Sequence, residues 1–173
     1  VVSFDETPIT ANTQLTTLVL HKPVGYVCSR NGQGSKTIYE LIPSEYAHLK
    51  PIGRLDKNSS GLLLMTNDGQ LAQQLTHPSY GKSKVYQVSL DKSLTAVDAK
   101  SIQQGVMLED GKSALGLNGS GKLWTITMSE GRNRQIRRTF EALGHEVVKL
   151  HRTQFGQYQL ANLRTGNYQE IIV

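Results

Sequence analysis

The sequence predicts an α+β fold built on a mixed, mainly antiparallel sheet. Three observations lead to this prediction: strand-like segments outnumber helical ones, they follow one another in groups, and short turns rich in Gly, Asn, Asp and Ser separate them. A doubly wound parallel sheet would need strands and helices in regular alternation, which the sequence lacks. No repeat or long linker divides the chain. We therefore expect a polar tail over residues 1–16 and a single domain over residues 17–173.

Composition narrows the class of protein. A chain of 173 residues, 38% of them hydrophobic, is long enough to bury one core. The net charge of +5 mildly favours a polyanionic partner. Cys28 is the only cysteine, so no internal disulfide can form and a reducing compartment, the cytoplasm, is expected. No segment approaches the roughly 20 apolar residues of a membrane helix, and the start does not resemble a signal peptide. Because the first residue is not Met, we expect a trimmed chain or a fragment.

In the first half of the chain, apolar runs predict strands, and turn or capping residues predict the breaks between them. The run 17–21 is rich in strand formers and ends before Pro23. The run 62–66 has turn residues on both sides, which predicts a buried strand. Three further elements are expected here: a short helix that Thr37 caps and that ends at Leu41, an extended segment over 51–56, and a short helix with Leu71, Ala72 and Leu75 on one face.

In the second half, alternation indicates half-buried strands. Tyr86, Val88 and Leu90 occupy every second position of one strand, and the segment 123–128 alternates in the same way. Short strands joined by glycine turns are expected over 106–129, and more strand over 147–158. Two helices are expected, one from Thr95 to Gln104 and one that Asn133 caps and that ends at Leu143.

Three common functional motifs fail on inspection. The segment from Gly116 to Lys122 matches most of a phosphate-binding loop, but Leu123 stands where the metal-binding hydroxyl is needed, and a strand follows instead of a helix. A hairpin turn explains it better. The five histidines have no metal-ligand spacing, and no serine lies in a Gly-x-Ser-x-Gly elbow. We therefore expect no metal, no nucleotide cofactor and no hydrolase triad.

A cluster of basic residues stands at the start of the last predicted helix, and four arginines fall within its seven residues: Arg132, Arg134, Arg137 and Arg138. Positive charge is unfavourable at a helix N-terminus, so the cluster could serve an anionic partner, and Arg suits phosphate. The other interpretation is a solvated helix face, since Ile136, Phe140 and Leu143 would bury the opposite side. Composition alone leaves both open. From local sequence alone, Asp56 would be a turn-forming residue and Tyr86 an ordinary aromatic residue of a strand.

Several segments, taken together and in order, resemble the RsuA-type ribosomal-RNA pseudouridine synthases over about residues 17–172. They read His-Lys-Pro-Val-Gly-Tyr-Val-Cys-Ser at 21–29, Gly-Arg-Leu-Asp-Lys-Asn-Ser-Ser-Gly at 53–61, Leu-Leu-Leu-Met-Thr-Asn-Asp-Gly at 62–69, Lys-Val-Tyr at 84–86, Glu-Gly-Arg-Asn-Arg-Gln-Ile-Arg-Arg at 130–138 and Lys-Leu-His-Arg-Thr at 149–153. The resemblance implies the pseudouridine-synthase fold, with a central catalytic cleft across the sheet and flanking helices. Members of this family commonly carry a small upstream RNA-binding domain.

The resemblance also implies a site. Asp56 matches the catalytic aspartate, Tyr86 the tyrosine against the target base, and Arg137 the basic residue that pairs with the aspartate. Ile136 and Leu150 match apolar pocket positions. The remaining basic residues expected to hold RNA phosphates are Lys22, Arg54, Arg132, Arg134 and Arg138. The expected partner is ribosomal RNA or its precursor, bound by a monomer.

The implied chemistry suits one carboxylate in a dry pocket. Isomerising uridine to pseudouridine oxidises nothing and imports no group, so no cofactor is needed. An ionised carboxylate can act as a nucleophile or as a base on the sugar, and a neighbouring arginine would keep it charged. Two alternatives remain open: a catalytically idle RNA-binding module of the same fold, and a glycosylase that releases the base.

Overall fold

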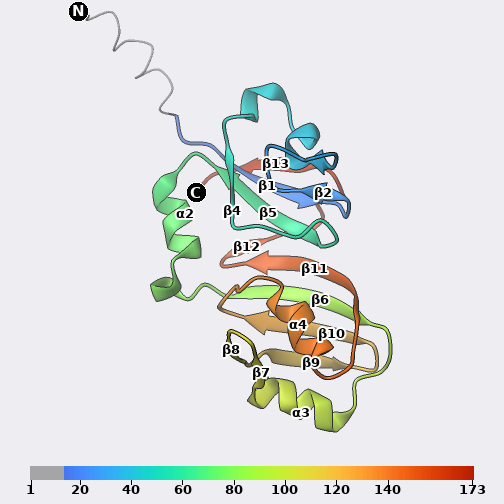
Figure 1. Cartoon of the computed structure of the whole chain (residues 1–173). Helices are drawn as coiled ribbons and strands as arrows, with labels where there is room; N and C mark the ends of the chain where they lie inside the picture. The colour runs from blue at the N-terminus through green and yellow to red at the C-terminus, as the bar shows by residue number, and fades with distance from the viewer. Residues whose placement is uncertain (1–13) are drawn as a thin grey trace, which may run out of the picture.

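The computed structural model describes residues 14–173 as two groups of strands joined into one sheet of nine strands (Figure 1). The order along the sheet is β13 (Tyr168–Ile171), β1 (Thr17–Lys22), β5 (Ser60–Thr66), β11 (Val147–Phe155), β6 (Lys84–Leu90), β10 (Leu123–Met128) and β9 (Gly116–Ser120). Two short strands pair off this path, β4 (Lys50–Ile52) with β5 and β12 (Tyr158–Gln159) with β11. Within this sheet only the β5–β11 pair is parallel, so the mixed, mainly antiparallel prediction is confirmed for the described residues.

The strand β5 explains the unbroken apolar run of the sequence, because both of its faces are buried. Leu63 and Met65 belong to the larger apolar cluster, whereas Leu62 and Leu64 belong to a smaller cluster behind the sheet. All four are fully buried. The smaller cluster is completed by helix α2 (Gly69–Thr76), whose N-terminus Asp68 caps through hydrogen bonds from the N–H groups at its first turn. A strand buried on both faces needs no alternation, which is why periodicity is absent here.

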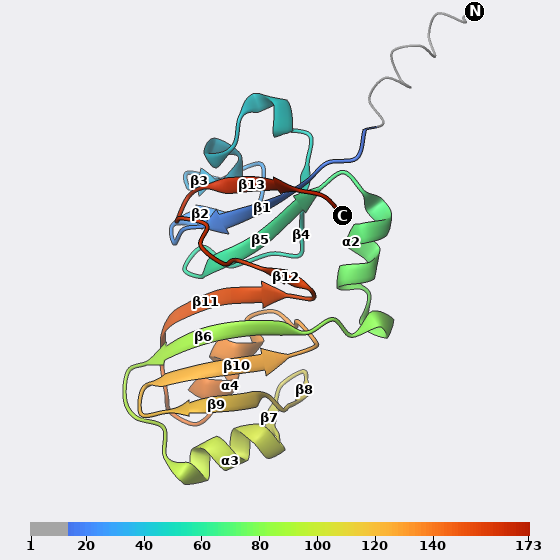
Figure 2. The same ribbon diagram turned by 180° about the vertical axis from the view of Figure 1, so that it is seen from behind.

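The other half of the sheet is covered mainly on one face. Helix α4 (Gln135–Glu141) lies against the sheet in Figure 1, and Figure 2 shows it behind the strands when the molecule is turned. Helix α3 (Ala96–Gln104) lies beside the edge strand β9 and begins after Thr95, whose hydroxyl accepts from Asp98 N–H as predicted. Tyr86, Val88 and Leu90 of β6 are buried, so the predicted alternation is confirmed.

The two halves of the sheet meet at the β5–β11 pair. Only two residue pairs align there, His151 with Ser60 and Arg152 with Gly61. Gly61 has a φ of +112°, and a Cβ at this position would overlap the backbone of Arg152. A side chain is therefore excluded by conformation and by space at the point where the sheet is continuous.

The remaining short elements complete the chain. They are β2 (Tyr26–Val27), β3 (Lys36–Thr37), the hairpin of β7 (Val106–Leu108) with β8 (Gly111–Ser113), and the 3-10 turns Ile38–Leu41, Ser44–Tyr46 and Pro78–Tyr80. The helix expected after Thr37 is thus a single 3-10 turn. The segment from Gly116 to Lys122 belongs to the β9–β10 hairpin, which confirms that it is no phosphate loop.

Some predicted boundaries were wrong. The last helix starts at Gln135 rather than after Asn133. The residue before it, Arg134, has a left-handed backbone (φ +50°) and makes no side-chain capping hydrogen bond, while the Gln135 side chain accepts from Arg132 N–H. The extended segment 51–56 ends at Ile52, and strand β13 was not predicted. Of the predicted tail, residues 1–13 lie outside the described part, and Thr16 N–H donates to the Asn67 side chain.

Candidate active site

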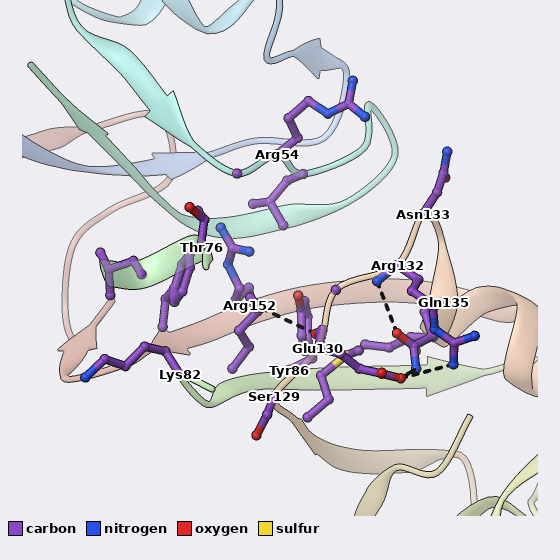
Figure 3. A pocket seen from close by; sticks show the side chains of 18 of the residues that line it. Arg54, Thr76, Lys82, Tyr86, Ser129, Glu130, Arg132, Asn133, Gln135 and Arg152 are labelled. Carbon is purple, nitrogen blue, oxygen red and sulfur yellow. Dashed lines mark hydrogen bonds and ion pairs between the residues drawn. The ribbon is translucent and has the colours of Figure 1, made fainter. Parts of the chain in front are cut away.

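A cavity of about 810 Å³ opens where the two halves of the sheet meet (Figure 3). Four residues that the resemblance singled out line it, each from a different element: Asp56 from the turn before β5, Tyr86 from β6, Ile136 from α4 and Leu150 from β11. Arg54, Arg132 and Arg134 also line it, whereas Lys22, Arg137 and Arg138 do not. The fold therefore collects distant sequence segments around one carboxylate.

Backbone hydrogen bonds fix the turn that carries Asp56. Leu55 is buried in the larger core, Ser59 N–H donates to Asp56 O at 3.0 Å, and Ser59 itself is buried. The carboxylate is displayed between these two anchors, with 39% of the Asp56 side chain exposed. A short turn with buried residues at both ends holds its central side chain in a defined place, which a reacting group requires.

Lys22 supports this turn from its buried side and does not line the cavity. The side chain is fully buried, and its ammonium group donates to three backbone carbonyls: Asp56 O at 2.9 Å, Ser59 O at 2.7 Å and Pro23 O at 3.0 Å. Burial lowers the pKa of Lys22 to about 8, and the nearby charges of Cys28 and Asp56 offset part of this effect. The expectation that Lys22 holds an RNA phosphate is therefore wrong, because all three of its donors are used inside the protein.

The expected ion pair of Asp56 with Arg137 is not present, and both residues lie in the described part of the chain. Arg134 makes it instead, with 3.1 Å between its Nη1 and Asp56 Oδ2. Arg137 is buried and donates to Val147 O and Asn58 O at 3.0 Å each and to Ser59 Oγ at 3.3 Å. It thus ties α4 to the Asp56 turn. Arg134 has a left-handed backbone, with a φ of +50°.

Arg132 and Arg138 have partners of their own. Both guanidinium groups bind the carboxylate of Asp110, in the β7–β8 turn, at 2.9 Å, and Arg132 also binds Glu130 at 3.0 Å. The Arg138 hydrogen bond is the main cause that lowers the pKa of Asp110. These contacts brace the loop before α4 against the β7–β8 hairpin. The expected phosphate role of these two arginines stays a prediction, and Arg54 is exposed at the cavity and free of such ion pairs within residues 14–173.

The floor of the cavity is apolar. Tyr86, Ile136, Leu150 and Met128 are each less than a tenth exposed and lie beside one another in the larger core cluster. Glu130 is a second carboxylate at the cavity, but the side chains of Arg132 and Gln135 donate to it. Asp56 therefore differs from Glu130 in facing a flat apolar surface, with a single arginine as its partner.

The cavity residues that the sequence reasoning missed include two cations, Lys84 and Arg152. Both carry a signal that could have found them. Lys84 precedes Tyr86 by two residues and Arg152 follows Leu150 by two, so each shares a strand face with a residue already singled out. Within the described residues, no group of three or more potential metal ligands comes together, and no helix is long and apolar enough to cross a membrane.

Comparisons with known proteins agree with this site. The sequence profile described as RNA pseudouridylate synthase matches residues 16–142. Ribosomal large subunit pseudouridine synthase B of Bacillus subtilis is 36% identical over 162 residues, which are 88% of this chain and 66% of that protein. The Escherichia coli K12 protein of the same name is 36% identical over 163 residues, 89% of this chain and 56% of that protein. The chain thus spans about half to two thirds of the length of these relatives.

Solved structures give the same result. A structure described as a pseudouridylate synthase superimposes with a TM-score of 0.86 at 32% identity, covering 92% of this chain and 71% of the other. The archaeal box H/ACA Nop10–Cbf5 complex matches with a TM-score of 0.56 at 16% identity over 90% of this chain and 52% of the other, a likeness of fold alone. The family that the sequence motifs indicated is therefore confirmed, together with its fold. The chain belongs to the RNA pseudouridylate synthase family.

Proposed function

We propose that this chain isomerises uridine to pseudouridine in ribosomal RNA, with Asp56 as the reacting carboxylate. The observation that carries the proposal is the placement of Asp56, ion-paired with Arg134 and opposite an apolar floor that contains Tyr86. Curated relatives are named as synthases of the large ribosomal subunit, which makes large-subunit RNA the first substrate to test. We also propose that residues 17–173 act as a single catalytic domain, as a monomer in the cytoplasm.

The reaction balances without any added group. The N1–C1′ bond of uridine breaks, the base turns, and a C5–C1′ bond forms, while C5 loses a proton and N1 gains one. Asp56 would act as nucleophile or base in its ionised form, and the Arg134 guanidinium lies 3.1 Å from its Oδ2. The apolar floor excludes water, which would otherwise intercept the broken glycosidic bond and release the base.

Tyr86 supplies the surface for the base. A uridine must leave its stack to be reached, and a buried tyrosine in a cavity offers a flat face to receive it. Ile136 and Leu150 flank that position. The base is thus held between apolar side chains while it turns, and the ribose faces the carboxylate of Asp56.

The decisive experiment compares the wild-type chain with Asp56→Asn, which keeps the shape and removes the charge. Wild type should form pseudouridine in unmodified ribosomal RNA, mapped by carbodiimide-stop sequencing, and Asp56→Asn should lose several powers of ten in rate, each worth about 1.4 kcal/mol. Glu45→Gln, at an exposed site outside the cavity, is the matched control and should keep full activity.

Each alternative predicts a different result in the same assay. A glycosylase would release free uracil, which chromatography detects, and an idle binding module would bind RNA without forming either product. If Asp56→Asn keeps most of the wild-type rate in a single turnover, the proposed role of this carboxylate is wrong.

A further inference from the structure

The cavity has a second, cationic part that the chemistry at Asp56 does not use. Lys84 of β6 and Arg152 of β11 meet there over the buried ring of Phe155. The Lys84 Nζ lies 5.2 Å and the Arg152 Cζ 4.8 Å from the ring centroid. All three residues line the cavity, and Figure 3 shows Arg152 in its wall with Tyr86.

Arg152 is held rigidly with one donor group unused. The residue is 2% exposed, and its Nε donates to Leu62 O at 2.9 Å in the neighbouring strand β5. Its Nη2 is buried and has no hydrogen-bond partner among the described residues. A buried guanidinium nitrogen without a partner costs stability unless a ligand supplies an acceptor. The Nε hydrogen bond and the contact with the Phe155 ring limit the movement of this side chain, which lines the cavity.

Lys84 places a second positive charge in the same part. Its side chain is half-buried, and its only hydrogen bond among the described residues is a long one, 3.4 Å, to the backbone carbonyl of Glu130. The pKa of Lys84 is lowered, first by burial and then by the charge of Arg152. Within residues 14–173 neither cation belongs to an ion pair, and the nearby Glu130 carboxylate is engaged by Arg132 and Gln135. Two desolvated cations without a counter-charge indicate an anionic ligand.

We propose that Lys84 and Arg152 bind the phosphodiester of the RNA nucleotide next to the target uridine. The inference rests on the proposed function. Arg152 is the cross-strand partner of Tyr86, and Lys84 precedes Tyr86 by two residues, about 7 Å along the strand. That separation suits one nucleotide step, so the base can lie on Tyr86 while the adjoining phosphate reaches the two cations. Lys82, which is exposed and also lines the cavity, adds a further positive charge beside these two cations.

The test is a double-mutant cycle, which measures whether removing one protein charge and removing one RNA charge affect binding independently. Stem-loops that each carry a single uncharged methylphosphonate, at successive positions around the target uridine, are titrated with wild type and with Lys84→Gln. At one flanking position the methylphosphonate should weaken wild-type binding about tenfold and should scarcely weaken Lys84→Gln further. The salt dependence of Lys84→Gln binding should also fall by about 0.7–0.9 units of log–log slope.

Lys100→Gln is the matched control, because Lys100 is an exposed lysine of α3, at the far end of the sheet. It should behave like wild type at every methylphosphonate position. Arg152→Lys keeps the charge but cannot keep both the Leu62 contact and the free donor, so it should lose part of the coupling. Thermal unfolding of each variant checks that the fold is intact.

The outcomes separate this inference from the proposed function. If wild type forms pseudouridine but the effects of Lys84→Gln and of every methylphosphonate are independent, the phosphate site is wrong and the function stands. The phosphate site is also wrong if Lys100→Gln couples as strongly as Lys84→Gln. If wild type neither binds the RNA nor forms product, both proposals fall together.

Discussion

Raising the pH above 8 should slow the reaction through Lys22, although the Lys22 side chain is fully buried. As an ammonium group it has three protons, and three carbonyls accept them, two from the Asp56 turn. Its pKa of about 8 in the folded protein means that the third proton is lost near that pH. A neutral amine can donate only two hydrogen bonds, so one carbonyl loses its partner and the turn that presents Asp56 loosens.

The effect on stability has the opposite sign. The ordinary pKa is 10.5 and the folded value is about 8, so between these values the unfolded chain binds more protons than the folded chain. The contribution of this group to the free energy of unfolding therefore rises as the pH increases from 8 to 10.5. At 1.36 kcal/mol per pH unit, the full rise is about 3 kcal/mol. Activity should fall while this stability term grows, so measuring unfolding over the same pH range distinguishes loss of rate from unfolding.

The assay measures single-turnover rates at saturating RNA from pH 6.5 to 9.5, with urea unfolding over the same range. Wild type should lose activity with a midpoint near pH 8. Lys22→Met should be slower throughout and should lack this transition, since it has no proton to lose. Lys57→Met is the control: Lys57 lies in the same turn but is exposed, with its ammonium group on Ser35. If the transition persists in Lys22→Met, or is absent from Lys57→Met, the reasoning is refuted.

Three further predictions test the candidate active site and the sheet that supports it. Tyr86→Phe should keep RNA affinity, whereas Tyr86→Ala should lose about 1–3 kcal/mol of base stacking in a binding titration; equally small effects on turnover would make Tyr86 a mere core residue. Arg134→Met should mainly slow turnover, and Arg137→Met should mainly lower stability, by about 3 kcal/mol of unfolding free energy, because its buried hydrogen bonds are lost. If Arg137→Met instead mainly slows turnover and Arg134→Met mainly lowers stability, the Asp56–Arg137 pair expected from the sequence is correct. Gly61→Ala should cost about 2 kcal/mol or more in denaturant unfolding, against a gain or no change for Gly69→Ala, where a Cβ has open space.

Periodicity and capping predicted the elements that obey local rules. The alternation of β6 and β10, the capped helix α3 and the fully apolar β5 follow from pleat geometry, an N-cap hydroxyl and burial on two faces. Strand β13 could not be predicted in this way, because its side chains are at best partly buried and its sequence does not alternate clearly. Its place depends on pairing with β1, a contact between the two ends of the described chain.

The expected Asp56–Arg137 ion pair shows which features of a site a motif match can predict and which it cannot. The motif matched Arg137 to the partner of Asp56, but among the described residues Arg134 forms this ion pair, whereas Arg132 and Arg138 bind Asp110 and Arg137 is buried. Arg134, which forms this pair, has a left-handed backbone, and the sequence does not predict it because the position holds neither glycine nor asparagine. The neighbouring Gln135 side chain holds this turn through Arg132 N–H and Ser113 Oγ. Contacts of this kind between distant segments cannot be predicted from the spacing of motif residues in the sequence.

The short β5–β11 pair connects the sheet to the candidate active site. Arg152 stands there with its backbone against Gly61, its Nε on Leu62 O and its side chain in the cavity beside Tyr86. Lys22, on the adjoining strand β1, pairs with Gly61 in register and supports the Asp56 turn through its ammonium group. The backbone around one glycine thus positions both the Asp56 carboxylate and the cationic part of the cavity. A small shift of β5 against β11 would move both at once, so Gly61→Ala should impair RNA binding and turnover together even in molecules that remain folded.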